Sequence, residues 1–81
     1  MRLESGCDVL GRVRNAGARD LLVTVEFRAF DHRNRGIATG DTGRVPVPAA
    51  GQSSFRATLI FILRCDTVNR LEVTEIRTRP A

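Results

Sequence analysis

Residues 21–30 read Leu-Leu-Val-Thr-Val-Glu-Phe-Arg-Ala-Phe, and this stretch decides the fold class. Its apolar residues alternate with polar ones at Val23, Val25, Phe27 and Ala29. Because successive side chains of a β-strand point to opposite faces, an alternation of period two predicts a strand with one buried face. A helix would instead need apolar residues three and four positions apart.

Three other stretches of the chain show the same alternation. Residues 7–14 alternate from Cys7 to Val13, and residues 55–65 alternate from Phe55 to Cys65. Leu71 and Val73 continue the pattern, but Ile76 falls out of step, which predicts a β-bulge or a shared face. The parities predict a core that contains Val9, Val13, Val23, Val25, Phe27, Leu59, Phe61 and Val73.

Turn residues separate these strands. Residues 15–17, 32–36 and 46–52 are rich in Gly, Pro and Asn, which favour turns. Residues 37–47 predict one short edge strand, because Pro46 cannot donate a hydrogen bond in a central ladder. Together the pattern predicts an all-β fold, a small antiparallel immunoglobulin-like β-sandwich of five to seven strands, with residues 1–81 as a single domain.

The length bounds what the chain can be. Its 81 residues allow one small domain with a modest core, which excludes a two-domain enzyme. No run of 18 apolar residues exists, so the sequence predicts no membrane span. No signal peptide is visible after Met1. We therefore expect a cytoplasmic protein if Met1 is the native start, and otherwise a piece of a longer protein.

The charge is basic but dispersed. Thirteen arginines against nine acidic residues give a net charge of +4, which attracts polyanions non-specifically. Arg33 and Arg35 are the only two arginines that lie close together in an expected loop, and aromatic residues are 5% of the chain. Dedicated nucleic-acid binders concentrate charge and add stacking aromatics, so we expect a solvated surface. A small basic β-barrel that binds nucleic acid is the alternative.

Three segments in order resemble the bacterial FxLYD domain family. The segment Gly11-Arg12-Val13-Arg14-Asn15 resembles the first strand of the family, which carries a glycine, a valine and an asparagine. Phe27-Arg28-Ala29-Phe30-Asp31 is similar to the Phe-x-Leu-Tyr-Asp pentapeptide, with Phe30 in the place of Tyr, whereas Ala29 departs from Leu. The segment from Pro48 to Phe55 resembles the family's proline-glycine turn and following strand. The resemblance covers residues 7 to about 78.

The resemblance implies a function as well as a fold. It implies an immunoglobulin-like sandwich of a bacterial envelope or secreted protein, without catalytic chemistry. On this basis we expect a non-enzymatic spacer or protein-interaction module, extracytoplasmic if the chain is a fragment of a larger protein. Its partner would be a protein, either a second copy or a domain of the parent protein, bound through an apolar sheet face or an open edge strand.

The residues that could carry chemistry have structural interpretations. His32 is the only histidine and has no partners with metal-ligand or catalytic spacing, so we expect an ordinary loop residue. Asp41-Thr42-Gly43 matches the aspartic-protease tripeptide, but that chemistry needs two facing copies and apolar flanking strands. Asp31 is expected to accept backbone hydrogen bonds in the turn after its strand. The sequence therefore predicts no catalytic residue, no metal site and no cofactor.

The two cysteines, Cys7 and Cys65, share parity with core residues, so both side chains are expected to point inward. Two interpretations remain open, a disulfide or two buried thiols packed as small apolar groups. A disulfide would favour an oxidising compartment.

The side chains that are predicted to point outward are less polar than those of a sheet whose outer face contacts water. Four large apolar residues occupy it: Leu10, Leu22, Ile60 and Ile62. If their strands are neighbours in one sheet, these side chains form a contiguous apolar patch, which usually marks a partner surface. The alternative is that a bulge shifts the parity or that a loop covers them.

Overall fold

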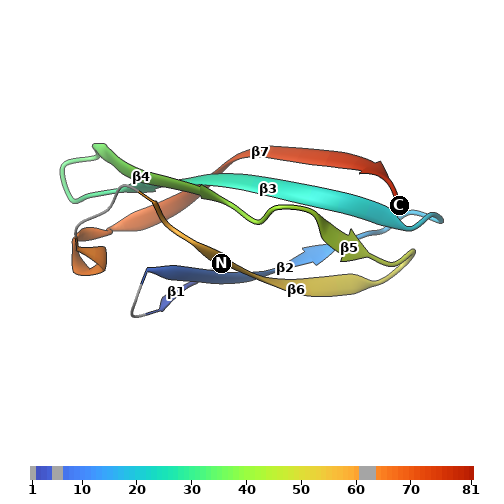
Figure 1. Cartoon of the computed structure of the whole chain (residues 1–81). Coiled ribbons are helices and arrows are strands. Elements are labelled where there is room, and N and C mark those ends of the chain that lie inside the picture. Colours follow the sequence, from blue (N-terminus) through green and yellow to red (C-terminus); the bar gives the residue numbers. More distant parts are fainter. Residues whose placement is uncertain (1, 5–6, 61–63) are drawn as a thin grey trace.

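The computed structural model describes residues 2–4, 7–60 and 64–81, and within them seven strands form two antiparallel sheets (Figure 1). The first sheet contains β1 (Arg2–Glu4), β2 (Asp8–Arg14) and β6 (Gln52–Thr58), with β2 in the centre. The second sheet contains β3 (Leu21–Phe30), β4 (Gly36–Asp41), β5 (Val45–Val47) and β7 (Arg70–Pro80). A 3₁₀ turn, η1 (Cys65–Thr67), precedes β7. The predicted small antiparallel all-β fold is confirmed.

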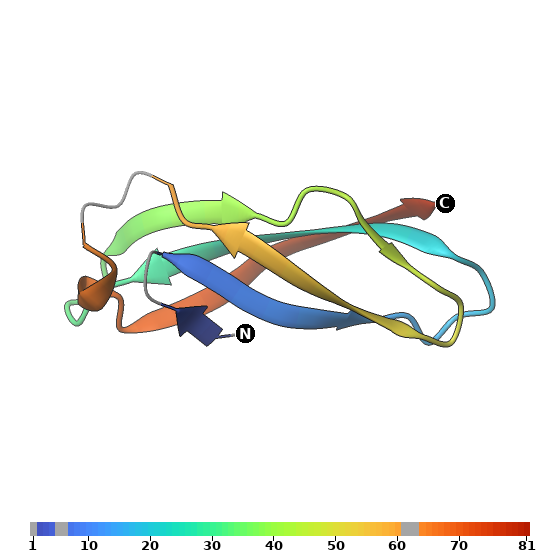
Figure 2. The same ribbon diagram turned by 60° about the horizontal axis from the view of Figure 1, so that its bottom comes forward.

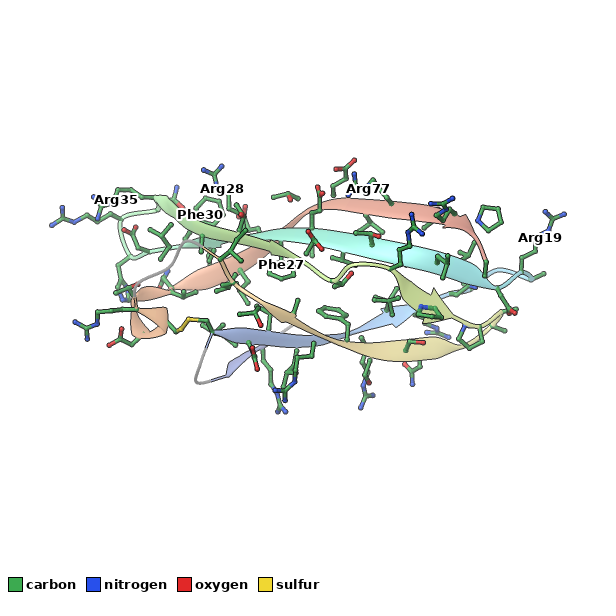
Figure 3. The ribbon with its side chains drawn as sticks, in the orientation of Figure 1. Arg19, Phe27, Arg28, Phe30, Arg35 and Arg77 are labelled. Atoms are coloured by element: carbon green, nitrogen blue, oxygen red, sulfur yellow. A yellow bond between two sulfur atoms is a disulfide. The ribbon has the colours of Figure 1, made fainter. Side chains whose placement is uncertain are left out.

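Strand β3 is the centre of the second sheet. It pairs with β7 over its whole length, so β4 and β5 share its other edge. Phe27 of β3 is 1% exposed and lies between the two sheets (Figure 3). The buried core that surrounds it contains Val9, Val23, Val25, Ala29, Ala38, Val45, Val47, Phe55, Ala57 and Leu59.

The observed core agrees with most of the predicted one. Five of the predicted residues are buried: Val9, Val23, Val25, Phe27 and Leu59. Val13 is half-buried and packs against this core, and Phe61 lies outside the described residues. The prediction for Val73 is wrong, because this side chain is 46% exposed. Its strand parity is inward, but the space opposite it is not filled by the first sheet.

The predicted strand over 55–65 is wrong at both ends. Strand β6 begins three residues earlier, at Gln52, and ends at Thr58. There the chain crosses between the sheets: the Leu59 N–H donates to the Cys7 carbonyl at 2.9 Å, and the Ile60 N–H donates to the Thr39 carbonyl at 2.9 Å. The backbone N–H groups of these adjacent residues therefore bond to different sheets, and Leu59 is buried whereas Ile60 is 49% exposed. Cys65 belongs to η1 and not to a strand.

The single edge strand predicted over 37–47 is two strands, β4 and β5. Thr42, Gly43 and Arg44 separate them, and Gly43 adopts a left-handed φ of 63°, which glycine accommodates without strain. Pro46 lies in the middle of β5, on the edge of the sheet, where its missing N–H costs no ladder bond.

Of the two explanations for the displaced Ile76, a bulge or a shared face, the structure shows a bulge in β7. Glu75 pairs with Glu26 but Val73 pairs with Phe27, so Thr74 is the extra residue. Beyond the bulge Ile76 pairs with Val25. Because of the extra residue, Val73 and Ile76 lie on the same face of β7, and this face is directed at the first sheet.

The turn that follows β2 is held by Asn15, a buried polar residue with 5% exposure. Its Nδ2 donates to the carbonyls of Arg19 at 2.6 Å and Val47 at 3.3 Å, and its Oδ1 accepts from the Gly17 N–H at 2.9 Å. These bonds fix the end of β2 to the turn and to β5, and they position one end of the site described below.

Candidate functional site

The structure joins Cys7 and Cys65 in a disulfide with a Cα–Cα distance of 5.3 Å. The bond connects the residue before β2 to η1 and so ties the first sheet to the segment that enters β7 (Figure 3). It closes a loop with a sequence separation of 58, which restricts the unfolded chain strongly.

The four residues of the predicted apolar patch do not form one surface. Leu10 lies on the outer face of the first sheet, since its neighbour Val9 is buried. Leu22 lies on the outer face of the second sheet, on the opposite side of the sandwich. Ile60 is 49% exposed and bridges to Thr39 of β4. Ile62 lies outside the described residues.

The prediction of a contiguous patch is therefore wrong for Leu10 and Leu22. Parity along a strand reports whether a side chain points inward or outward, but it does not report which of the two sheets contains the strand. Here β2 and β3 follow each other in the sequence and belong to different sheets.

Asp31 closes the turn after β3, as predicted. Its Oδ1 accepts from the backbone N–H groups of Arg33 at 2.9 Å and Arg35 at 3.0 Å, and its Oδ2 accepts from Nε of Arg35 at 2.9 Å. The Arg35 backbone bond, together with the Arg35 guanidinium and the Arg33 N–H, lowers the pKa of the Asp31 carboxyl. The carboxylate is thus engaged in the turn, beside the exposed His32.

Asp41, Thr42 and Gly43 form the turn between β4 and β5. The Asp41 carboxylate accepts from the Gly43 N–H at 2.8 Å. The Thr42 hydroxyl accepts from the Val25 N–H at 3.0 Å and donates to the Gly43 carbonyl at 2.8 Å. These hydrogen bonds give the Asp41-Thr42-Gly43 tripeptide a structural role, which is to hold this turn.

The strongest candidate for a functional surface is β7, which the sequence did not single out. In the described part of the chain β7 pairs only with β3, so its second edge carries unpaired backbone groups. Every residue from Glu72 to Pro80 is exposed. Val73 and Ile76 point toward the first sheet and are nevertheless 46% and 60% exposed.

A groove of about 410 Å³ runs along the inner face of β7. Its second-sheet wall includes Val73, Ile76 and Thr78. The opposite wall belongs to the first sheet and includes Val13 and Phe55. The other residues that line it are Arg12, Arg14, Asn15, Ala16, Leu21, Val23 and Val25. The groove is thus mainly apolar and opens between the edges of the two sheets.

The groove lies beside a part of β2 that the described residues of β1 do not reach. They pair with residues 8–10 of β2, and no other described strand pairs with that edge of β2 from Gly11 to Arg14. Figure 2 shows β1 beside the start of β7, where Leu3 and Leu71 pack against the core. Farther along β7 no described strand pairs with the edge of β7 that faces away from β3.

The strands beside the groove carry charges of both signs. Arg12 and Arg14 line the groove from the first sheet and have outward parity there. Glu75, Arg77 and Arg79 lie on the outer face of β7. Arg77 donates to Glu26 at 2.8 Å, whereas Arg12, Arg14 and Arg79 form no ion pair within the described residues. The groove therefore has a mainly apolar lining, and the strands beside it carry charges of both signs.

The outer face of the second sheet carries two charged clusters. The first surrounds Phe30, with the Arg70 guanidinium 4.2 Å and the Arg28 guanidinium 5.6 Å from the ring centroid. In the second, a hydrogen bond with Glu75 raises the pKa of Glu26, and partial burial adds to this, while Arg77 opposes it.

The comparisons with known proteins do not indicate what this site binds. No helix in the described residues is both long and apolar enough to cross a membrane, and no group of three or more potential metal ligands is found among the same residues. Searches of protein-family models, of curated proteins and of solved structures found no match to this chain.

Proposed function

We propose that this chain is a non-enzymatic, immunoglobulin-like protein-interaction or spacer module of a bacterial envelope or secreted protein. The observation that carries the proposal is β7, a long edge strand whose inward apolar residues Val73 and Ile76 are exposed. A monomeric domain normally covers, shortens or charges such an edge, so an uncovered one suits binding of another chain.

The strand pairing supports the immunoglobulin-like part of the proposal. Consecutive strands β2 and β3 belong to different sheets, β2 pairs with β6, and β3 pairs with β7. An immunoglobulin-like sandwich divides its consecutive strands between two sheets in this way. The Cys7–Cys65 disulfide supports an oxidising, extracytoplasmic location, where such bonds persist.

The polar residues support a role without catalysis. Asp31 and Asp41, the two loop carboxylates considered above, accept backbone hydrogen bonds that close turns. We therefore attribute a structural role to both side chains, which stabilise the turns.

Selection from a displayed library of random peptides tests the proposal. The oxidised protein is immobilised, and the selected peptides are measured by titration with about 0.2 M salt, at which weak polyanion contacts are screened. We expect peptides that bind with micromolar Kd. No selected peptide, together with retention of single-stranded DNA or RNA at that salt concentration, would overturn the proposal.

Nucleic-acid binding is the second candidate, and the outer face of the first sheet favours it. Arg2 and Arg56 flank Leu10 there, and Arg12 lies one row farther along. However, Arg56 is bonded to Asp8 at 2.8 Å, and the aromatic residue of β6, Phe55, is buried and cannot stack on a base.

A further inference from the structure

We propose that the outer face of the first sheet binds the phosphate groups of an anionic membrane surface. This inference goes beyond the proposed protein binding, which concerns β7, and does not depend on it. It follows from three features of one sheet face: an excess of positive charge, the spread of this charge over three strands, and the residues between the arginines.

The two sheets differ in their charge. The strands of the second sheet carry equal numbers of basic and acidic residues: Arg28, Arg70, Arg77 and Arg79 against Glu26, Asp41, Glu72 and Glu75. The strands of the first sheet carry more basic than acidic residues: Arg2, Arg12, Arg14 and Arg56 against Glu4 and Asp8. The excess positive charge of the strands therefore belongs to the first sheet.

The four arginines of the first sheet have outward parity. Each is adjacent in its strand to a side chain that packs in the core or against it: Leu3, Val13, Phe55 or Ala57. Arg12 and Arg14 are exposed, and they form no ion pair within the residues that the structure describes. The arginines therefore gather their charge on the side of the sheet that faces away from the core.

The two acidic residues of this sheet occupy one end of it. Glu4 and Thr58 pair with Asp8 from its two sides in the strand register. The Asp8 carboxylate accepts from the Arg56 guanidinium at 2.8 Å and from the Thr58 hydroxyl at 2.8 Å. The outward residues of the other described rows are basic, polar or apolar: Arg2, Leu10 and Arg56, then Arg12 and Ser54, then Arg14 and Gln52. Most of the face therefore lies beyond its carboxylates.

The positive charges spread over a surface and not along one line. Arg2 and Arg56 pair with Leu10 from opposite sides, so their backbones are about 10 Å apart at the usual strand spacing. Arg14 lies about 13 Å farther along β2 at the usual rise per residue. A hollow of about 700 Å³ lies between them, and its lining includes Arg2, Leu10, Arg12 and Ser54. A planar array of phosphates would therefore contact several of these guanidinium groups at once.

The residues between the arginines indicate the kind of partner. Guanidinium groups bind phosphate oxygens through paired N–H donors, and an anionic bilayer attracts arginines near its surface. A strand of nucleic acid would stack its bases on aromatic side chains, but the one phenylalanine of these strands, Phe55, is buried. A protein interface would need an apolar centre, whereas Leu10 is the one large apolar residue of outward parity in these strands. The face therefore suits the phosphates of a membrane.

Co-sedimentation with vesicles tests the inference. The oxidised protein is mixed with vesicles of phosphatidylglycerol and phosphatidylcholine in equal amounts, and with vesicles of phosphatidylcholine alone. We expect binding to the anionic vesicles at low salt and release at about 0.5 M salt, where charges are screened within a few Å. We expect no binding to the neutral vesicles. Equal binding to both kinds of vesicle, or no binding to the anionic ones, would overturn the inference.

Two double variants of equal net charge locate the contact. Arg12→Gln with Arg14→Gln should weaken binding to the anionic vesicles about thirtyfold, the factor that corresponds to roughly 1 kcal/mol for each arginine. Arg44→Gln with Arg79→Gln is the control, since these exposed arginines line a hollow on the second sheet. Its loss should be much smaller. Equal losses would mean that the vesicles respond only to the net charge, and the assignment to the first sheet would be wrong.

A tryptophan reporter identifies the bound face independently. The chain contains no tryptophan, so Leu10→Trp and Leu22→Trp each introduce a single indole at an outward position, one on each sheet. With anionic vesicles that contain brominated lipid, the fluorescence of the Leu10→Trp variant should be quenched and that of the Leu22→Trp variant should not. Equal quenching of both variants would contradict the inference. Thermal unfolding of every variant establishes that the fold is intact.

A single-stranded thymidine oligonucleotide separates the membrane from nucleic acid. We expect the oligonucleotide to be released at a lower salt concentration than the anionic vesicles. If it stays bound at about 0.2 M salt while the vesicles are released, and the Arg12 and Arg14 double variant loses it, the face belongs to nucleic acid and the membrane proposal is wrong. Peptides from the library that bind this double variant as tightly as the parent would leave the protein-binding proposal in place, whatever the vesicles show.

Discussion

The two ends of the sandwich differ in how the gap between the sheets is closed. At the end that contains η1, β1 lies beside the start of β7, Leu3 and Leu71 pack against the core, and the Cys7–Cys65 disulfide joins the sheets. At the other end no described residue pairs with the same edge of β2, and Ile76 is 60% exposed. The comparison shows that β7 is held by its pairing with β3 throughout, but by packing from the first sheet only at one end.

The largest expected effect comes from the residue that both ends share. Phe27→Ala removes the side chain that fills the centre between the sheets and should lower the free energy of unfolding by about 3 to 5 kcal/mol. Urea denaturation measures the change. An unchanged midpoint would mean that the core does not depend on this ring and that the two ends are held independently.

The disulfide should stabilise the closed end. Replacing both Cys7 and Cys65 by serine should cost about 2 to 4 kcal/mol, because the unfolded chain regains the freedom of a loop with a separation of 58. Reduction of the parent protein should reproduce the loss. Mass spectrometry after alkylation without reductant checks the bond itself, since two alkylated cysteines would show that it had not formed.

A matched pair of substitutions in β7 compares the ends directly. Leu71→Ala should cost about 1 kcal/mol, since this half-buried side chain packs against the core. Ile76→Ala should change stability by less than about 0.5 kcal/mol, as expected for an exposed position. Equal costs for the two variants would mean that Ile76 is covered in solution, and the open end would then be closed.

The smallest effect concerns the outer face of β7. The pKa of Glu26 is raised, chiefly by its hydrogen bond with Glu75, so the contribution of this pair is present below the ordinary glutamate pKa and is lost as the pH rises through the raised value. Glu75→Gln should therefore make the protein slightly more stable at neutral pH relative to acidic pH. Thermal unfolding at several pH values measures the difference, and Glu72→Gln, on the same strand, is the control.

Much of this behaviour was predictable from local sequence pattern. The alternation in 21–30 predicted β3 with its bounds, and the displaced Ile76 predicted the bulge in β7, because the side-chain period of a strand is a property of a few adjacent residues. Asp31 was predicted as a turn acceptor for the same reason, since its hydrogen bonds reach only Arg33 and Arg35.

The tertiary structure decided features that the alternation of apolar and polar residues along a strand does not specify. Leu10 and Leu22 both have outward parity, yet they lie on opposite faces, because pairing with β6 or with β7 assigns each strand to its sheet. Val73 has inward parity and is exposed, because burial requires a second surface opposite the strand, and the described residues do not cover this position. The sequence determined the strands and their two faces, whereas long-range hydrogen bonding determined which faces meet and which edge stays open.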